Sequence, residues 1–75
     1  MSKYLTENEL VEFRTYIYAY GLTQTQIGAL CYRNNGTISV ALRKNKFERE
    51  WAELVYYKHA ERHNAKPLIK LSFIN

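Results

Sequence analysis

The fold of this chain is decided by the segment LTQTQIGALCYRNNGTISVALRK, residues 22–44. Thr23 and Gln26 have the spacing of a capping box, in which two side chains satisfy free backbone amides at the start of a helix. Asn34 has the side chain of a good helix N-cap, and it predicts a further helix that runs to about Lys44. The segment should therefore form two short helices joined by a tight turn.

Small and apolar side chains lie where two such helices would cross. Gly28 is the small residue in the first helix, and Ala41 allows the second helix to approach closely. Four more apolar side chains would point inward: Ile27, Leu30, Cys31 and Ile38. Two short helices packed steeply in this way form a helix-turn-helix.

The flanking sequences predict two longer helices. Thr6 and Glu9 repeat the spacing of a capping box, and Gly21 supplies a stop, so a helix is expected from the first pair to the glycine. A fourth helix is expected over about residues 46–63, before the break at Pro67. Its buried stripe has helical spacing: Phe47, Trp51, Leu54 and Val55.

The last residues have a different pattern. In residues 68–74, LIKLSFI, apolar side chains alternate with polar ones as in a half-buried strand. A single strand is not stable alone, so the tail either packs back on the helices or pairs with its twin in a dimer. The chain is therefore interpreted as mostly α, with a four-helix helix-turn-helix domain over residues 1–66 and a short C-terminal β-like arm over residues 67–75.

Positive charge is concentrated in the middle of the chain. The net charge is +4 at pH 7. Residues 23–46 carry no acidic residue and four basic ones: Arg33, Arg43, Lys44 and Lys46. A patch of one sign is typical of proteins that bind a polyanion. The charge and the helix-turn-helix therefore indicate the same kind of partner, double-stranded DNA.

The composition argues against several other classes of protein. No apolar stretch approaches the ~20 residues of a membrane span and the N-terminus lacks a signal-peptide core, so a cytoplasmic location is expected. The chain has no aspartate and no Ser/His or Cys/His arrangement, so we expect no enzyme, small-molecule substrate or cofactor. His59 and His63 lack a third ligand at metal spacing and are interpreted as a solvated pair. Cys31, the single cysteine, should be a buried small hydrophobe.

The central segment resembles a known family. Leu22-Thr23-Gln24 at its start and Thr37-Ile38-Ser39 in its second helix are similar to the lambda-repressor/Cro-like helix-turn-helix family, which includes small phage Cro proteins and XRE-type regulators. The gap between the two runs matches without an insertion, and the similarity covers under a third of the chain. It implies a Cro-like transcriptional repressor that binds a pseudo-palindromic DNA operator as a homodimer.

The turn between the two helices departs from the family. Glycine and then an aliphatic residue are usual there, where this chain has Tyr32 and Arg33. Because tyrosine is disfavoured at positive φ, we expect the turn to shift by a residue and to use Asn34 or Asn35 instead. Arg33 would have to extend its charged end to solvent or to a DNA phosphate.

The resemblance implies a recognition helix from Asn35 to about Lys44. Its base-reading positions would be Asn35, Gly36, Ser39, Val40 and Arg43. Contacts with DNA phosphates would come from Gln24, Thr25, Arg33, Asn34, Lys44 and Lys46. Asn35 can pair with adenine and Val40 can touch the methyl group of thymine, whereas the lysines would position the protein without reading the sequence.

Two alternatives stay open. A recombination accessory factor of the excisionase type would also bind DNA, but it would bend the duplex and need phased sites rather than one palindrome. A small phage protein that inhibits a host protein by direct binding would use the tyrosine-rich surface of the chain. Such an inhibitor would show no salt-sensitive DNA binding.

Overall fold

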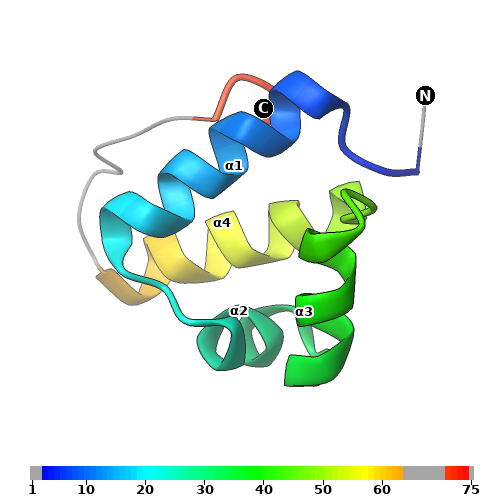
Figure 1. The fold of residues 1–75 in the computed structure, drawn as a ribbon. Helices are drawn as coiled ribbons and strands as arrows, with labels where there is room; N and C mark the ends of the chain where they lie inside the picture. The colour runs from blue at the N-terminus through cyan, green and yellow to red at the C-terminus, as the bar shows by residue number, and fades with distance from the viewer. Residues whose placement is uncertain (1–2, 64–70, 75) are drawn as a thin grey trace.

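The computed structural model of the chain describes residues 3–63 and 71–74. In these residues four helices follow one another: α1 (Glu7–Tyr20), α2 (Gln24–Cys31), α3 (Asn35–Arg43) and α4 (Arg49–His63). Figure 1 shows α4 running through the middle, with α1 along one side and with α2 and α3 on the other. The described part contains no sheet, only an isolated bridge between Tyr4 and Glu48. The mostly α fold class is therefore confirmed.

Side-chain caps define where the first three helices begin. Thr6 accepts from the backbone amide of Glu9 at 3.2 Å, and Glu9 accepts in return from the amide of Thr6 at 2.9 Å. Thr23 and Gln26 repeat this exchange at 3.1 and 2.9 Å. Asn34 Oδ1 accepts from the amide three residues further along, at 2.7 Å. Each cap typically stabilises a protein by about 1 kcal/mol, and all three starts agree with those predicted.

Apolar side chains from all four helices meet in one core. Its fully buried members include Phe13 of α1, Ile27 of α2, Ile38 of α3 and Val55 of α4. Cys31 is buried as predicted, and its Sγ donates to the carbonyl of Ile27 at 3.2 Å. Burying a phenylalanine, isoleucine or valine side chain contributes roughly 1.5–3 kcal/mol. The inward stripes of the four helices therefore hold the fold together.

The C-terminal tail does not form the predicted strand where it is described. Residues 71–74 form a turn, in which the amide of Ile74 donates to the carbonyl of Leu71 at 3.2 Å. Both of these side chains are buried in the core, and the hydroxyl of Ser72 donates to Glu12 of α1 at 2.6 Å. The alternative of a tail that packs back on the helices is therefore confirmed here, because the core buries apolar side chains that a lone strand would expose. The rest of the predicted arm lies outside the described residues.

His59 is buried, which corrects its interpretation as a solvated residue. Its Nδ1 lies 2.6 Å from the hydroxyl oxygen of Tyr16, and its ring meets the rings of Tyr16 and Tyr20 edge-on. Position 59 lies about one helical turn beyond the buried Val55, so it continues the buried stripe of α4 toward α1. The side chain of His63, the other member of the predicted pair, lies outside the described part.

An ion pair joins the start of α1 to the start of α4. Arg49 donates to both carboxylate oxygens of Glu9, at 2.9 and 2.8 Å. α4 begins at this arginine, slightly later than the predicted residue 46. The hydrogen bonds from Arg49 lower the pKa of Glu9 from about 4.5 to about 2. The carboxylate that also caps α1 therefore stays ionised well into the acid range.

Glu9→Gln should make the free energy of unfolding depend less steeply on pH in the acid range. Because the folded pKa of Glu9 is lowered, its stabilisation is complete above the ordinary pKa near 4.5 and is lost as the pH falls toward 2. Urea midpoints measured from neutral pH down to this range should therefore fall less steeply for the variant than for the wild type. Parallel curves for the two proteins would contradict a native-state ion pair.

Tyr16→Phe should destabilise the fold by about 1–3 kcal/mol, because it removes the hydroxyl partner of a buried histidine nitrogen. Tyr18→Phe is the matched control, since Tyr18 is 89% exposed on the same helix and its change should shift the free energy of unfolding by less than about 0.5 kcal/mol. Urea denaturation followed by circular dichroism measures both variants. Equal midpoints would show that the bond between Tyr16 and His59 does not stabilise the fold.

Candidate nucleic-acid interface

Tyr32 lies in the turn between α2 and α3 without the predicted shift of register. It adopts the left-handed conformation itself, with φ 61° and ψ 41°. The expected use of Asn34 or Asn35 in its place is therefore wrong, because Asn34 is the N-cap of α3 and Asn35 is the first residue of that helix. A left-handed tyrosine costs roughly 1–2 kcal/mol. Lys58 offsets part of this cost, since it hydrogen-bonds the Tyr32 hydroxyl and its Nζ lies 4.6 Å from the ring centroid.

Gly28 is required by the backbone of this turn. The amide of Arg33 donates to the carbonyl of Gly28 at 2.8 Å, which brings the turn against the body of α2. A Cβ on Gly28 would overlap the carbonyl oxygen of Arg33. The predicted need for a small residue is confirmed, but the group that comes closest is the turn rather than the crossing helix.

The side chain of Arg33 lies over Trp51 of α4 and avoids burial of its charge. It is exposed, and its guanidinium carbon lies 5.4 Å from the ring centroid of Trp51. An arginine over an aromatic face is attracted by the negative charge of the ring. The apolar slot that the family pattern assigns to this position is therefore absent here, and a phosphate contact by Arg33 stays a prediction.

The outer face of α3 carries the predicted base-reading positions. Asn35, Gly36, Val40 and Arg43 are exposed and Ser39 is half-buried. The inner face of the helix is buried: Ile38, Ala41 and Leu42. All five predicted positions fall on one side of this nine-residue helix, and none of them is acidic.

The candidate phosphate contacts are exposed at the start of α2 and after α3. Gln24 and Thr25 lie in the first turn of α2, where backbone amides without a helical partner can bind an anion. Lys44 and Lys46 are exposed in the connection from α3 to α4. Asn34 is exposed as well, but its Oδ1 caps α3, so only its amide nitrogen could meet a phosphate.

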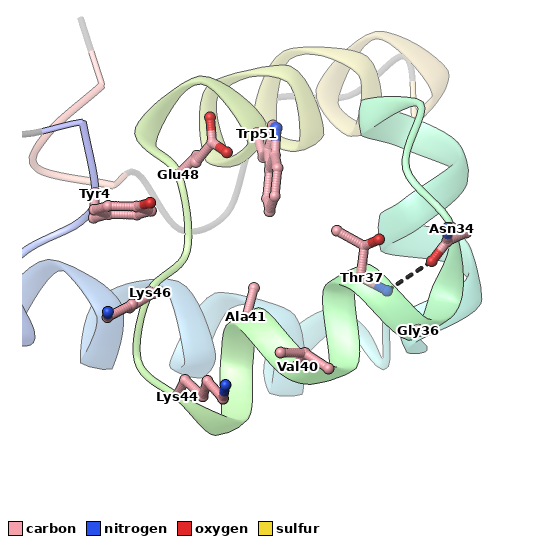
Figure 2. A pocket seen from close by; sticks show the side chains of 10 residues that line it. All are labelled: Tyr4, Asn34, Gly36, Thr37, Val40, Ala41, Lys44, Lys46, Glu48 and Trp51. Carbon is pink, nitrogen blue, oxygen red and sulfur yellow. Dashed lines mark hydrogen bonds between the residues drawn. The ribbon is translucent and has the colours of Figure 1, made fainter.

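A hollow of about 610 Å³ opens beside α3. Figure 2 shows the indole of Trp51 extending from α4 toward Ala41, with Tyr4 on another side of the hollow. Lys44 and Lys46 also line it. Sequence reasoning missed both aromatic residues as neighbours of α3, because their places depend on the packing of α4 and of the N-terminal segment. The indole Nε1 of Trp51 is buried without a hydrogen-bond partner in the described part.

Two other kinds of feature are not found in residues 3–63 and 71–74. These residues contain no group of three histidines, cysteines or acids that could hold a metal ion. None of their helices is long and apolar enough to cross a membrane. The single thiol, Cys31, is buried, and burial raises its pKa, so its reactive thiolate form is disfavoured.

No family model matches this sequence, and no curated protein or solved structure matches it significantly. The resemblance of residues 22–39 to the Cro-like family therefore stays a prediction. The function has to be inferred from the geometry of α2, α3 and their surroundings.

Gly28→Ala should destabilise the fold by about 3 kcal/mol or more, because the added methyl group meets backbone that cannot move without opening the turn. Gly36→Ala is the matched control. There the nearest atom to the added Cβ is 3.4 Å away on a side chain, and alanine in a helix is favoured over glycine by roughly 0.5–1 kcal/mol. Thermal unfolding should therefore separate the two variants widely. A Gly28→Ala protein as stable as the wild type would contradict the close approach.

Proposed function

We propose that this chain is a sequence-specific DNA-binding protein that regulates transcription as a Cro-like repressor, bound to a pseudo-palindromic operator as a homodimer. One observation carries the proposal. The outer face of α3 presents five positions that suit base reading, on one side of the helix and with no acidic side chain among them.

The dimensions and chemistry of α3 suit the major groove of DNA. Nine residues of helix span about 13 Å, and a major groove about 12 Å wide admits an α-helix. Asn35 can form two hydrogen bonds with adenine, and Val40, which is 41% exposed, can contact the methyl group of thymine. Gly36 between them lets the backbone approach the base edges.

The surroundings of α3 suit the phosphate backbone. Lys44 and Lys46 supply positive charge after the helix, and the first turn of α2 supplies free amides. Such contacts would set the position of the protein on the duplex, while the α3 face would set its sequence preference. The affinity should therefore depend steeply on salt, because bound phosphates release their counterions.

A second copy of the chain would raise the affinity to a useful level. One small domain makes few DNA contacts, and joining two of them makes the second binding event intramolecular. In a two-fold dimer two α3 helices would enter successive major grooves about 34 Å apart. A dimer on its operator would block polymerase by its bulk. The cytoplasm is the compartment in which we expect this binding.

Exposed tyrosines favour one alternative function. Tyr32 and Tyr57 are 66% and 49% exposed, and tyrosine is enriched at protein–protein interfaces. On this alternative the chain inhibits a host protein through these side chains, and the helix-turn-helix is only a scaffold. DNA binding distinguishes the two functions.

Selection from a random-sequence DNA pool, followed by gel shifts over a salt series, tests the proposal. Wild type should enrich a pseudo-palindrome. Asn35→Ala should lose discrimination of about 1–3 kcal/mol at one base pair of each half-site. Lys44→Ala should weaken all sequences alike and reduce the slope of log K against log salt by about one.

Val11→Ala provides the control, since Val11 is an exposed side chain on α1 and its change should leave binding unaltered. Absence of binding by the wild type even at low salt would contradict the DNA proposal and would favour a protein partner.

A further inference from the structure

Tyr18 is the most exposed large apolar side chain in the described part of the chain, at 89%. Its ring lies outside the aromatic cluster that the neighbouring Tyr16 and Tyr20 form within α1. A single exposed aromatic residue is common on protein surfaces and needs no special explanation. The place of Tyr18 in the fold is what makes it informative.

Tyr18 borders a hollow of about 480 Å³ that is lined by α1, by the connection from α1 to α2 and by the last turn of α3. Leu22 lines it just before the start of α2, and Leu42 lines it in the last turn of α3. Gln24 follows closely after the first of these residues, and Arg43 follows directly after the second. Both are candidate DNA contacts, so the hollow that Tyr18 borders adjoins, along the chain, two positions of the candidate interface.

The described lining of the hollow beside Tyr18 carries one charge, and that charge is positive. Arg14 is the only charged residue among the described residues that line the hollow. Its guanidinium donates to the carbonyl of Leu42 and, at 3.1 Å, to Oδ1 of Asn45, so the charge is held in place. The free amides in the first turn of α2 add partial positive charge nearby. This combination favours an anionic partner over a purely apolar one.

We propose that Tyr18 binds a DNA phosphate, with its hydroxyl donating to a phosphate oxygen of the strand that passes the start of α2. This inference rests on the proposed function. Half or more of protein–DNA hydrogen bonds go to phosphates and sugars, and tyrosine is among the side chains that donate them. A second copy of the chain suits the hollow less well, because two-fold pairing on this surface would bring two Arg14 charges together.

Tyr18→Phe is the decisive variant, because it removes only the hydroxyl and keeps the ring. DNA affinity measured by fluorescence anisotropy over a salt series should fall about 10-fold or more on every sequence, as expected for one hydrogen bond to a charged acceptor. The slope of log K against log salt should stay at the wild-type value, because tyrosine is uncharged and its contact releases no counterion. Lys44→Ala, which removes a charge, should reduce that slope in the same assay.

Tyr57→Phe is the matched control, since it makes the same change on an exposed tyrosine of α4, and it should bind DNA as the wild type does. Circular dichroism of all variants confirms that the fold is retained.

Four other results would overturn the inference about Tyr18. They also show whether the proposed DNA-binding function is wrong as well. If the wild type binds DNA and Tyr18→Phe binds as tightly, the phosphate contact is wrong and the proposed function stands. If Tyr18→Phe changes the preferred sequence instead of weakening all sequences alike, the hydroxyl reads bases and the assignment to phosphate is wrong. If Tyr18→Ala shifts the monomer–dimer equilibrium without DNA, the residue belongs to an interface between copies. If the wild type binds no DNA, both the inference and the proposed function are wrong.

Discussion

The approach of Gly28 to the carbonyl of Arg33 is the constraint on which the direction of α3 depends. Any side chain at Gly28 would overlap that oxygen, and the amide of Arg33 donates back to the carbonyl of Gly28 at 2.8 Å. Glycine at this position therefore permits the turn that the chain adopts, with Tyr32 left-handed and Asn34 placed to cap α3. Once α3 begins there, its buried stripe must meet the core, and its remaining side chains must face outward.

The outward face of α3 is thus a consequence of packing on the other face. Ile38 and Ala41 are buried, and because side chains in a helix recur every 3.6 residues, this burial leaves Asn35 and Val40 in solvent. These side chains contribute little to folding, so their identity is open to selection for a ligand.

Local chemistry in the sequence was enough to predict the first three helix starts, because a capping threonine or asparagine acts within one turn of its own backbone. It failed where distant packing decides. Tyr32 takes the left-handed conformation against its own preference, at the turn that packs against Gly28, where its ring also contacts Lys58. His59 is buried against Tyr16 and Tyr20, which are far away in the sequence, and its Nδ1 lies 2.6 Å from the hydroxyl oxygen of Tyr16. The hollow beside α3 could not be predicted either, since it is formed by segments that meet only in the folded chain.

Asn34 differs from the other candidate DNA contacts, because its side chain also caps a helix. Its Oδ1 holds the amide of Thr37 at 2.7 Å, so the cap fixes where α3 begins and hence which residues reach its outer face. Removing this side chain would weaken the helix by about 1 kcal/mol as well as any contact with phosphate. Lys44 and Lys46, by contrast, are exposed after the end of α3 and support it only through their backbone amides, which donate to the carbonyls of Val40 and Ala41 at 2.9 Å, so a change of either side chain leaves the end of the helix intact. A binding defect can therefore be attributed to lost DNA contact at the lysines, whereas at Asn34 it would also reflect a displaced or frayed α3.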